Sequence, residues 1–382
     1  MNWSRRSSAV IVFVALAIGQ GARDAALGQS TIVLRDFSIP ASPVARYDQD
    51  GVQLENGDTI TWDRVAKATV AVADQDRVDE WLQSIGEPLA RLRWRLEIGD
   101  FVGAQQAVGE LPDELHKRRS QTALLIRLAT MSYHIEQGDS MSAAIVWVGA
   151  LDLLSEHPAW RDQVPAKVHL PADPNTTLHP RLMPIWDSTV DAVRIWPSVE
   201  QLVENCDVDS LPLAALVYLS AIAIEAGKAD QAAAWIDLVA KRSIPWSKAL
   251  RWKLESTKGV VKHDLAAQLA ESRDWPAEVQ AVAMYWLAAR GLASQNSAEF
   301  ALAAVQALAV PARFQKEFPE LSAQVLDRVA ARSRTLGDDA TAQKLYKEIQ
   351  QNYPNTDAAR RLSHSPERLI EQPNANSRAP GQ

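Results

Sequence analysis

The stretch that decides the fold reads LSAQVLDRVAARSRTLGDDATAQKLYKEIQQNYPNTDAA, residues 321–359. Apolar residues recur at three- and four-residue intervals on both sides of Gly337-Asp338, a spacing typical of two helices. Glycine readily takes the positive φ that ends a helix, and the aspartate after it can cap the next one. Ala342 is small enough to let the two helices pack closely. The stretch therefore predicts a helix-turn-helix unit.

The same glycine-to-alanine step, five residues long, occurs at three earlier places: Gly99 to Ala104, Gly138 to Ala143 and Gly227 to Ala232. Asp100 and Asp139 follow two of these glycines and are expected helix caps. A further helix pair is expected over residues 279–308, with its turn at 294–297. The intervals between units are unequal, so insertions interrupt the array. Together the units predict a helical repeat domain over residues 73–362.

Residues 321–359 resemble the tetratricopeptide repeat. Tyr346 falls in the second helix, and Tyr353-Pro354 closes the unit where that family has its terminating proline. The three earlier units share the glycine-to-alanine step but lack a proline at the same distance. The resemblance implies an all-α fold, an α-solenoid of tetratricopeptide-like helix pairs. It also implies a concave groove, lined by the first helix of each pair, that binds peptides.

Residues 1–28 predict a signal peptide. They combine a basic start at Arg5-Arg6, an apolar run over 9–18 and small residues at Ala26-Leu27-Gly28, where a signal peptidase cleaves. The apolar run is too short to cross a bilayer, which takes about 20 residues. We therefore expect no transmembrane segment in the mature chain. It should begin near Gln29 and be exported to the periplasm or the extracellular space.

The charge and cysteine content exclude some classes of function. The net charge is −7, and loss of residues 1–28, with three arginines and one aspartate, would make it −9. A nucleic-acid partner is not expected, because phosphates attract basic surfaces. Cys206, the single cysteine, cannot form an internal disulfide, and a buried thiol or a bond between chains both remain open. Packing must then supply the stability.

Residues 31–72 predict a small β segment. Apolar and polar residues alternate over 52–55 and 59–62, on either side of Asn56-Gly57, which favours a hairpin turn. Because so few strands are marginal alone, the segment should dock on the first helices through Trp62 and Val65. This segment, the helix expected over 81–95 and the stretch 178–186 also resemble uncharacterised exported bacterial helical-repeat proteins. That likeness implies an architecture and no activity.

Residues 158–184 form a proline-rich insertion. Six prolines rule out a continuous helix there, because each lacks a backbone donor and clashes with the preceding turn. We expect a loop that folds over one face of the helices, anchored by Trp160, Met183 and Trp186. Four residues in or beside it could ligate a metal: His169, Asp173, His179 and Asp187. Their spacing matches no ligand pattern, so we predict neither a metal nor a cofactor.

No catalytic residue is predicted either. The chain contains no Gly-x-Ser-x-Gly elbow, no phosphate-binding glycine loop and no His-Glu-x-x-His pair. Among the tryptophans, Trp147 and Trp235 are expected in the core, whereas those that flank prolines are expected to be partly exposed: Trp246, Trp252 and Trp275. Residues 363–382 are polar, contain three prolines and are predicted to form a disordered tail.

Counting back from the turn glycines places five residues on the groove side of the first helices: Arg93, Ser132, Tyr218, Arg328 and Arg334. These are the candidate partner-binding residues. Apolar residues fall on the same side: Leu125, Leu128, Ala214 and Val217. Such a face cannot remain in water over several hundred Å². Either the proline-rich insertion covers it or a partner does.

The leading interpretation is an exported, non-enzymatic scaffold or protein-protein interaction module of the cell envelope, with another protein or peptide as its partner. The alternative is a structural, self-associating protein whose groove is filled by its own loop or by a second copy. A carbohydrate-active enzyme on a helical scaffold ranks third, because no pair of carboxylates with the required pattern stands out. The partner, the pathway and the oligomeric state remain open.

Overall fold

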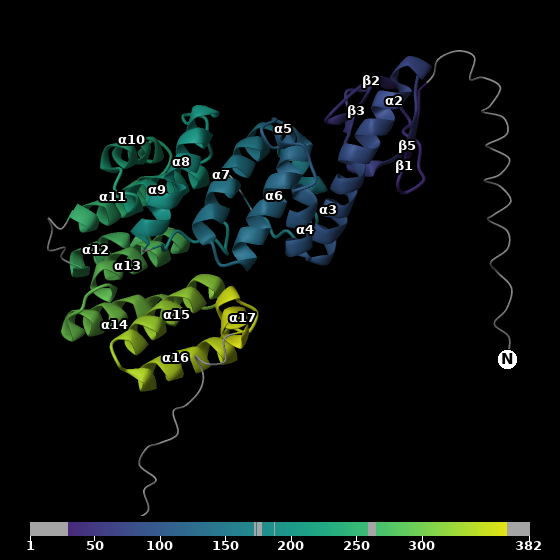
Figure 1. Cartoon of the computed structure of the whole chain (residues 1–382). Coiled ribbons are helices and arrows are strands. Elements are labelled where there is room, and N and C mark those ends of the chain that lie inside the picture. Colours follow the sequence, from purple (N-terminus) through teal and green to yellow (C-terminus); the bar gives the residue numbers. More distant parts are fainter. Residues whose placement is uncertain (1–29, 172, 174–177, 187, 259–264, 365–382) are drawn as a thin grey trace, which may run out of the picture. The chain divides into compact units, whose positions relative to one another are not determined.

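We describe the protein from a computed structural model that covers residues 30–171, 173, 178–186, 188–258 and 265–364. It is mostly helical and has a small N-terminal β segment (Figure 1). The chain divides into two compact units between Ala129 and Thr130, and the division falls within one helix. None of the helices in the described ranges has the length and apolar content that crossing a bilayer requires.

The first unit begins with five short strands. Strands β1 (Thr31–Leu34) and β5 (Val65–Thr69) pair antiparallel, and β2 (Val44–Asp48), β3 (Gly51–Leu54) and β4 (Thr59–Ile60) form a second antiparallel sheet. The turn between β3 and β4 contains the expected Asn56-Gly57, and Gly57 has φ 89°. The predicted hairpin is therefore present, with its second strand two residues shorter than expected.

The β segment docks on the first helices as the sequence predicts. Trp62, in a 3-10 turn over Trp62–Arg64, is fully buried, and its Nε1 donates to the carbonyl of Asp48 at 2.8 Å. Its ring centroid lies 5.9 Å from that of Trp81, at the end of α2 (Val72–Trp81). A π-type turn at Leu82–Gly86 leads into α3 (Glu87–Ile98), which packs on the same 3-10 turn.

The remaining helices of the first unit follow the glycine turn at residue 99. They are α4 (Phe101–Val108), the single-turn α5 (Asp113–His116) and the first part of α6 (Gln121–Glu136), in which the unit boundary lies. Helix α4 packs on α3. A core of leucines holds α3 in place: Leu89, Leu92 and Leu96 are fully buried.

The second unit contains the rest of α6 and the helices that follow it. These are α7 (Ser140–Glu156), α8 (Thr189–Glu204), α9 (Leu213–Glu225), α10 (Ala229–Ala240), α11 (Ile244–Lys258), α12 (Leu265–Glu271), α13 (Ala277–Leu292), α14 (Ser297–Phe314), α15 (Pro319–Thr335), α16 (Asp339–Asn352) and α17 (Asp357–His364). Helices adjacent in the chain pack as pairs, among them α9 with α10, α13 with α14 and α15 with α16 (Figure 1).

The glycine-to-alanine prediction is confirmed at all four turns. The glycines have positive φ, at Gly99 80°, Gly138 76°, Gly227 71° and Gly337 85°. The alanines of the same four steps are all buried. The expected aspartate caps are also present, since Asp100, Asp139 and Asp338 accept from the backbone N–H three residues on, at 2.9, 3.2 and 3.0 Å. Local residue chemistry therefore determines where each of these pairs turns.

The stretch 321–359 folds as the expected helix-turn-helix unit. Its core is one cluster of buried side chains from α15, α16 and α17, which includes Ala342, Tyr346 and Tyr353. The pair expected over 279–308 is also present as α13 and α14. Asn296 caps α14, and a Cβ on Gly291 would lie 2.5 Å from the Cβ of Ala303, so only glycine permits this close approach of the two helices.

One tryptophan prediction is wrong. Trp246 is buried, with its ring centroid 6.3 Å from that of Trp286, because α11 turns this side chain toward α13. Trp252 and Trp275 are half-buried, as expected, and their rings stack at 4.8 Å. The core positions of Trp147 and Trp235 are confirmed.

Two predictions lie largely outside the described residues. The expected signal peptide, residues 1–28, falls wholly within the part that the structure does not describe, and so does most of the expected tail. Residues 363 and 364 belong to the last turn of α17, so any tail begins after His364. Part of the proline-rich insertion is described: a 3-10 turn at Pro158–Gln163 and the stretch 178–186.

Candidate functional site

Residues 178–186, which we name the inner segment, lie among the helices of the second unit. Seven of the nine residues are buried: Leu178, His179, Leu182, Met183, Pro184, Ile185 and Trp186. Two prolines keep this segment out of a helix, so its backbone groups are free to bond with side chains of the surrounding helices. The insertion thus supplies part of the core.

Four hydrogen bonds attach the inner segment to three helices of the unit. The N–H of Leu178 donates to Glu278 on α13, and the N–H of His179 donates to the Tyr218 hydroxyl on α9, both at 2.8 Å. Trp286 Nε1 on α13 donates to the carbonyl of Pro184 at 2.7 Å. At the far end, Trp186 Nε1 donates to Ser140 Oγ on α7 at 3.0 Å.

His179 is held as a neutral imidazole. Its Nε2 donates to the carbonyl of His169 at 2.8 Å, and its Nδ1 accepts from the N–H of Arg181 at 3.2 Å. Burial lowers the pKa of His179 to about 4. Because both ring nitrogens already have hydrogen-bond partners, this histidine has no lone pair to offer a metal ion. No group of three or more potential ligands occurs in the described part of the chain, which leaves out Asp187.

Two buried carboxyl groups hold backbone N–H groups near the inner segment. Burial raises the pKa of Glu278, the partner of Leu178, to about 7. Burial, and then the charge of Asp357, raises the pKa of Glu320 on α15. Glu320 accepts from the backbone N–H of Asp357 at 3.1 Å. Both carboxyls therefore accept hydrogen bonds from the backbone, and both have a pKa above the usual value for glutamate.

An ion-pair network ties the inner segment to the last helix. Arg181 donates to both carboxylate oxygens of Asp357, at 2.8 and 2.5 Å, and to Glu136 on α6 at 3.0 Å. Burial alone would lower the pKa of Arg181, but its bonds to Asp357 raise it. Arg360 on α17 also pairs with Glu136 and Asp357. A fork of two parallel bonds fixes the guanidinium in orientation as well as in position.

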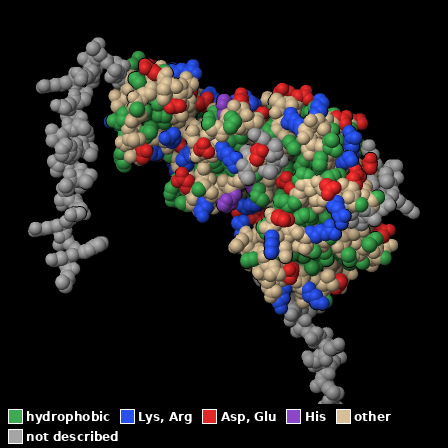
Figure 2. Space-filling view, turned by 180° about the vertical axis from the view of Figure 1, so that it is seen from behind, with side chains coloured by type: hydrophobic (Ala, Val, Ile, Leu, Met, Phe, Trp, Pro, Cys, Tyr) green, Lys and Arg blue, Asp and Glu red, His purple; other side chains and the backbone are tan. Residues whose placement is uncertain are grey.

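Beside this network lies a groove of the second unit, made of two hollows of about 330 and 390 Å³ that share Gly138, Ser140 and Arg328. Charged residues of both signs line it: Arg181, Arg194, Arg328, Arg361, Asp139, Asp191, Asp327 and Asp357. On the face of the protein shown in Figure 2, acidic and basic side chains are likewise interspersed. The groove is therefore polar and of mixed charge.

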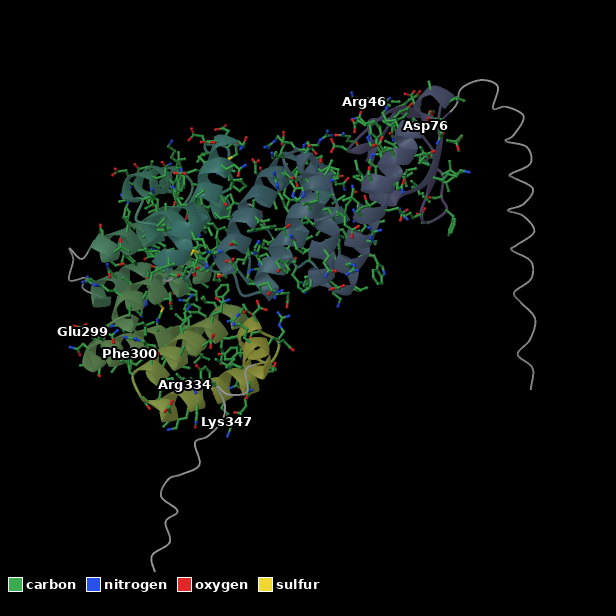
Figure 3. The ribbon with its side chains drawn as sticks, in the orientation of Figure 1. Arg46, Asp76, Glu299, Phe300, Arg334 and Lys347 are labelled. Carbon is green, nitrogen blue, oxygen red and sulfur yellow. The ribbon has the colours of Figure 1, made fainter. Side chains whose placement is uncertain are left out.

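Of the five predicted partner-binding residues, only Arg328 lines this groove. Its Nη1 donates to the Tyr285 hydroxyl at 3.1 Å, and its guanidinium carbon lies 5.7 Å from the centroid of that ring. Arg334 is exposed near the end of α15 and pairs with Asp339 at 3.7 Å (Figure 3). Ser132 and Tyr218 are buried by the protein's own chain. A partner therefore cannot reach these two side chains in this structure.

Arg93 belongs to the first unit. It pairs there with Asp63, whose side chain is buried, and it borders a hollow of about 250 Å³ together with Leu34, Ala90 and Trp94. This hollow is a second candidate surface, separate from the groove of the second unit.

The apolar residues expected on the groove side are buried: Leu125, Leu128, Ala214 and Val217. In the second unit the inner segment packs against Tyr218 on α9. The ring centroids of Trp186 and Tyr218 are 6.2 Å apart, and the N–H of His179 donates to the Tyr218 hydroxyl. The first of the two expected solutions, cover by the proline-rich insertion, is therefore present on this helix.

Sequence reasoning missed Arg181, Glu136 and Asp357. No local pattern signals a pair such as Arg181 and Asp357, because the two residues are 176 positions apart. The nearest signal was the arginine itself, a charged residue amid the apolar stretch 178–186.

Comparison with protein-family models, with curated proteins and with solved structures finds no significant match for this chain.

Proposed function

We propose that the protein is an exported, non-enzymatic scaffold of the cell envelope that binds another protein. In this proposal the helix pairs form an α-solenoid of tetratricopeptide-like repeats. The observation that carries it is the groove around Arg328, which is hollow, lined by charges of both signs and bordered by the buried ion pair of Arg181 and Asp357. Concave surfaces of stacked helix pairs are a common means of binding protein segments.

The lining of the groove defines the chemistry of the partner. Because the inner segment already takes apolar surface of the second unit, the partner would contribute polar and charged side chains of both signs. Ser140 and Gln324 add neutral hydrogen-bonding groups to the same walls. Such an interface depends on charge complementarity, so its association rate should fall as salt rises.

The second candidate is a structural, self-associating protein whose apolar groove is filled by its own loop or by a second copy. The burial of seven inner-segment residues favours it. The first candidate binds a different protein in the groove around Arg328, and the second does not. One experiment separates the two.

That experiment compares three forms of the tagged full chain as baits in the envelope fraction of the source organism: wild type, Arg328→Ala and Lys347→Ala. Lys347 is exposed on α16 and does not line the groove (Figure 3). We expect one set of proteins with wild type and Lys347→Ala, and its loss with Arg328→Ala, each variant being checked for native circular dichroism. Equal recovery by all three baits would contradict the groove proposal, and no recovery would favour the self-associating alternative.

Export has its own measurement. Fractionation followed by N-terminal sequencing should find the mature chain outside the cytoplasm, beginning near Gln29. An uncleaved cytoplasmic chain would contradict it.

A further inference from the structure

Helix α17 is held on the second unit by apolar and polar contacts with α15 and α16 (Figure 1). Ala358, Ala359 and Leu362 are buried in the cluster that the three helices share. Its first residue, Asp357, is also buried and donates its backbone N–H to Glu320 on α15. A helix of eight residues is marginal in water by itself. Helix α17 therefore keeps its structure only while it stays docked.

Glu320 lies against the start of α17, where both of its hydrogen-bond donors are neutral amides. Its carboxyl accepts from the N–H of Asp357 at 3.1 Å and from Nε2 of Gln324 at 3.3 Å. Only 8% of Glu320 is exposed. Within the part of the chain that the structure describes, it forms no ion pair. An ionised carboxylate in this place therefore loses water and gains no opposite charge in return.

The charged groups around Glu320 are already matched without it. Arg181 of the inner segment and Arg360 of α17 each pair with both Glu136 on α6 and Asp357. These four side chains are two guanidiniums and two carboxylates, so their charges cancel. Ionised Glu320 adds a third carboxylate and leaves the buried cluster with a net charge of −1. Protonation of Glu320 restores neutrality.

Other titratable groups on the surrounding elements do not supply the missing cation. His179 is held neutral, and Arg361 on α17 pairs with Asp327 at 3.5 Å. Arg328 is eight residues further along α15, a rise of about 12 Å. The rest are carboxyls, tyrosines and one exposed lysine that forms no ion pair within the described residues: Glu278, Glu317, Tyr285, Tyr353 and Lys316.

The docked position of α17 therefore favours a protonated Glu320. Asp357, in the first turn, already supplies the negative charge that a helix N-terminus favours, so a second charge there is in excess. Burial, and then the charge of Asp357, raises the pKa of Glu320. A protonated carboxyl still accepts the N–H of Asp357 through its carbonyl oxygen.

We propose that Glu320 is a pH-sensitive latch for α17: when protonated it keeps the helix docked, and when ionised it favours a state in which α17 has left α15 and water reaches the carboxylate. Docking is strongest below the ordinary pKa of glutamate, 4.5. It weakens by up to about tenfold per pH unit as pH rises toward the raised pKa of the docked state, and changes no further above it.

The latch acts on the groove around Arg328. Asp357 and Arg361 belong to the wall of its hollow of about 330 Å³. Release of α17 removes that part of the wall and takes the Asp357 carboxylate away from Arg181. The groove therefore changes in shape and in charge with pH. The latch itself needs no partner, so it can fail while the proposed function holds, and the reverse.

Hydrogen exchange of the full chain, from about pH 5 to about pH 9, is the first test. Protection is the exchange rate of an unstructured peptide at the same pH divided by that of the α17 amides. In wild type it should fall by up to about tenfold per pH unit and then level off, and it should fall more than that of the α9 amides. Glu320→Gln keeps an oxygen for the N–H of Asp357, so its α17 protection should not change with pH.

The matched control is Glu317→Gln, three residues earlier in the exposed turn before α15. It should show the same dependence on pH as wild type. Constant α17 protection in wild type would overturn the latch. So would an equal loss of protection in α17 and α9, or the same pH dependence in wild type and Glu320→Gln.

Tryptic cleavage of wild type is a second test, which does not depend on the folding of a variant. Arg360 and Arg361 lie within α17, and cleavage after them follows the population of the released helix. Mass spectrometry identifies these cuts among all others. Their rate, divided by that of an unstructured peptide at the same pH, should rise by the factor by which protection falls. A relative rate that does not change with pH would overturn the latch.

Discussion

Arg181 donates two hydrogen bonds to the Asp357 carboxylate, from Nε to Oδ2 at 2.8 Å and from Nη2 to Oδ1 at 2.5 Å. Arg181 comes from the inner segment and Asp357 from the first turn of α17. Both side chains are largely buried, with 18% and 8% exposed. The pair therefore joins the proline-rich insertion to the last helix of the second unit.

Removing one partner of this pair should be costly. Asp357→Asn leaves the Arg181 guanidinium with an incomplete set of acceptors in a buried place, and such losses destabilise by about 3 kcal/mol. Urea unfolding measures the change. Asp339→Asn is the matched control, since Asp339 is exposed and pairs with Arg334 at only 3.7 Å, and exposed pairs contribute at most about 1 kcal/mol. Equal losses in both variants would contradict the importance of the buried pair.

Overpacking at the α15–α16 contact should also be costly. Ala342 is buried in the cluster formed by α15, α16 and α17, so Ala342→Leu inserts three carbon atoms into filled space, at about 1 to 3 kcal/mol. Ala340 is exposed on the same helix, and Ala340→Leu should change little. Thermal unfolding of the two variants is the measurement. If they melt alike, the glycine-to-alanine step has no role in packing.

The turn glycines should resist substitution because of backbone strain alone. A Cβ on Gly337 would meet no atom within 4 Å, yet its φ is 85°. Gly337→Ala should therefore cost about 1 kcal/mol. Gly109 ends α4 with φ −66°, in the right-handed region, so Gly109→Ala should be neutral or slightly stabilising. The melting temperatures of the two variants are the measurement, and that of Gly337→Ala should be the lower. The reverse order would contradict backbone strain as the reason for glycine at the turn.

Stability should fall as pH rises through 7. Burial raises the pKa of Glu278 from 4.5 to about 7, so the folded chain holds this proton more tightly than the unfolded chain does. The resulting stabilisation is complete below pH 4.5 and is lost as pH rises through 7. His179 acts oppositely: its contribution is present above pH 6.5 and lost as pH falls through 4.

Measurements above pH 6.5 therefore isolate the carboxyl groups. There, the free energy of unfolding of wild type, measured with urea, should fall as pH rises. The expected decrease is up to about 1.4 kcal/mol per pH unit for each buried carboxyl. Glu278→Gln keeps an oxygen that can accept from Leu178 and removes the titration, so its slope should be smaller. An identical slope in both proteins would show that Glu278 does not titrate in this range.

The sequence predicts local features of this fold well. A positive φ at Gly337 and a cap at Asp338 depend on residues only a few positions apart, and so does the hairpin at Asn56-Gly57. Trp246 was placed wrongly because a neighbouring proline predicts a turn, and a turn alone does not tell which side of the helix faces the core.

The candidate site depends on contacts that no local pattern contains. Leu178 and Glu278 are 100 residues apart, and Arg181 and Asp357 are 176 apart. Counting along one helix gives the face of each residue, and Arg328 does line a hollow of the second unit, although its role as a partner-binding residue stays a prediction. Tyr218 was placed on the same face by the same count, and only the packing of the inner segment explains why it is buried.

Hydrogen exchange of the full chain tests most directly whether the inner segment fills the second unit. The N–H groups of Leu178 and His179 donate to buried side chains, and that of Leu182 donates to the His179 carbonyl at 2.9 Å. These amides should exchange as slowly as those of α9, whose side chains are almost all buried. Exchange of residues 178–186 as fast as at the exposed turn around Gly57 would contradict a packed inner segment.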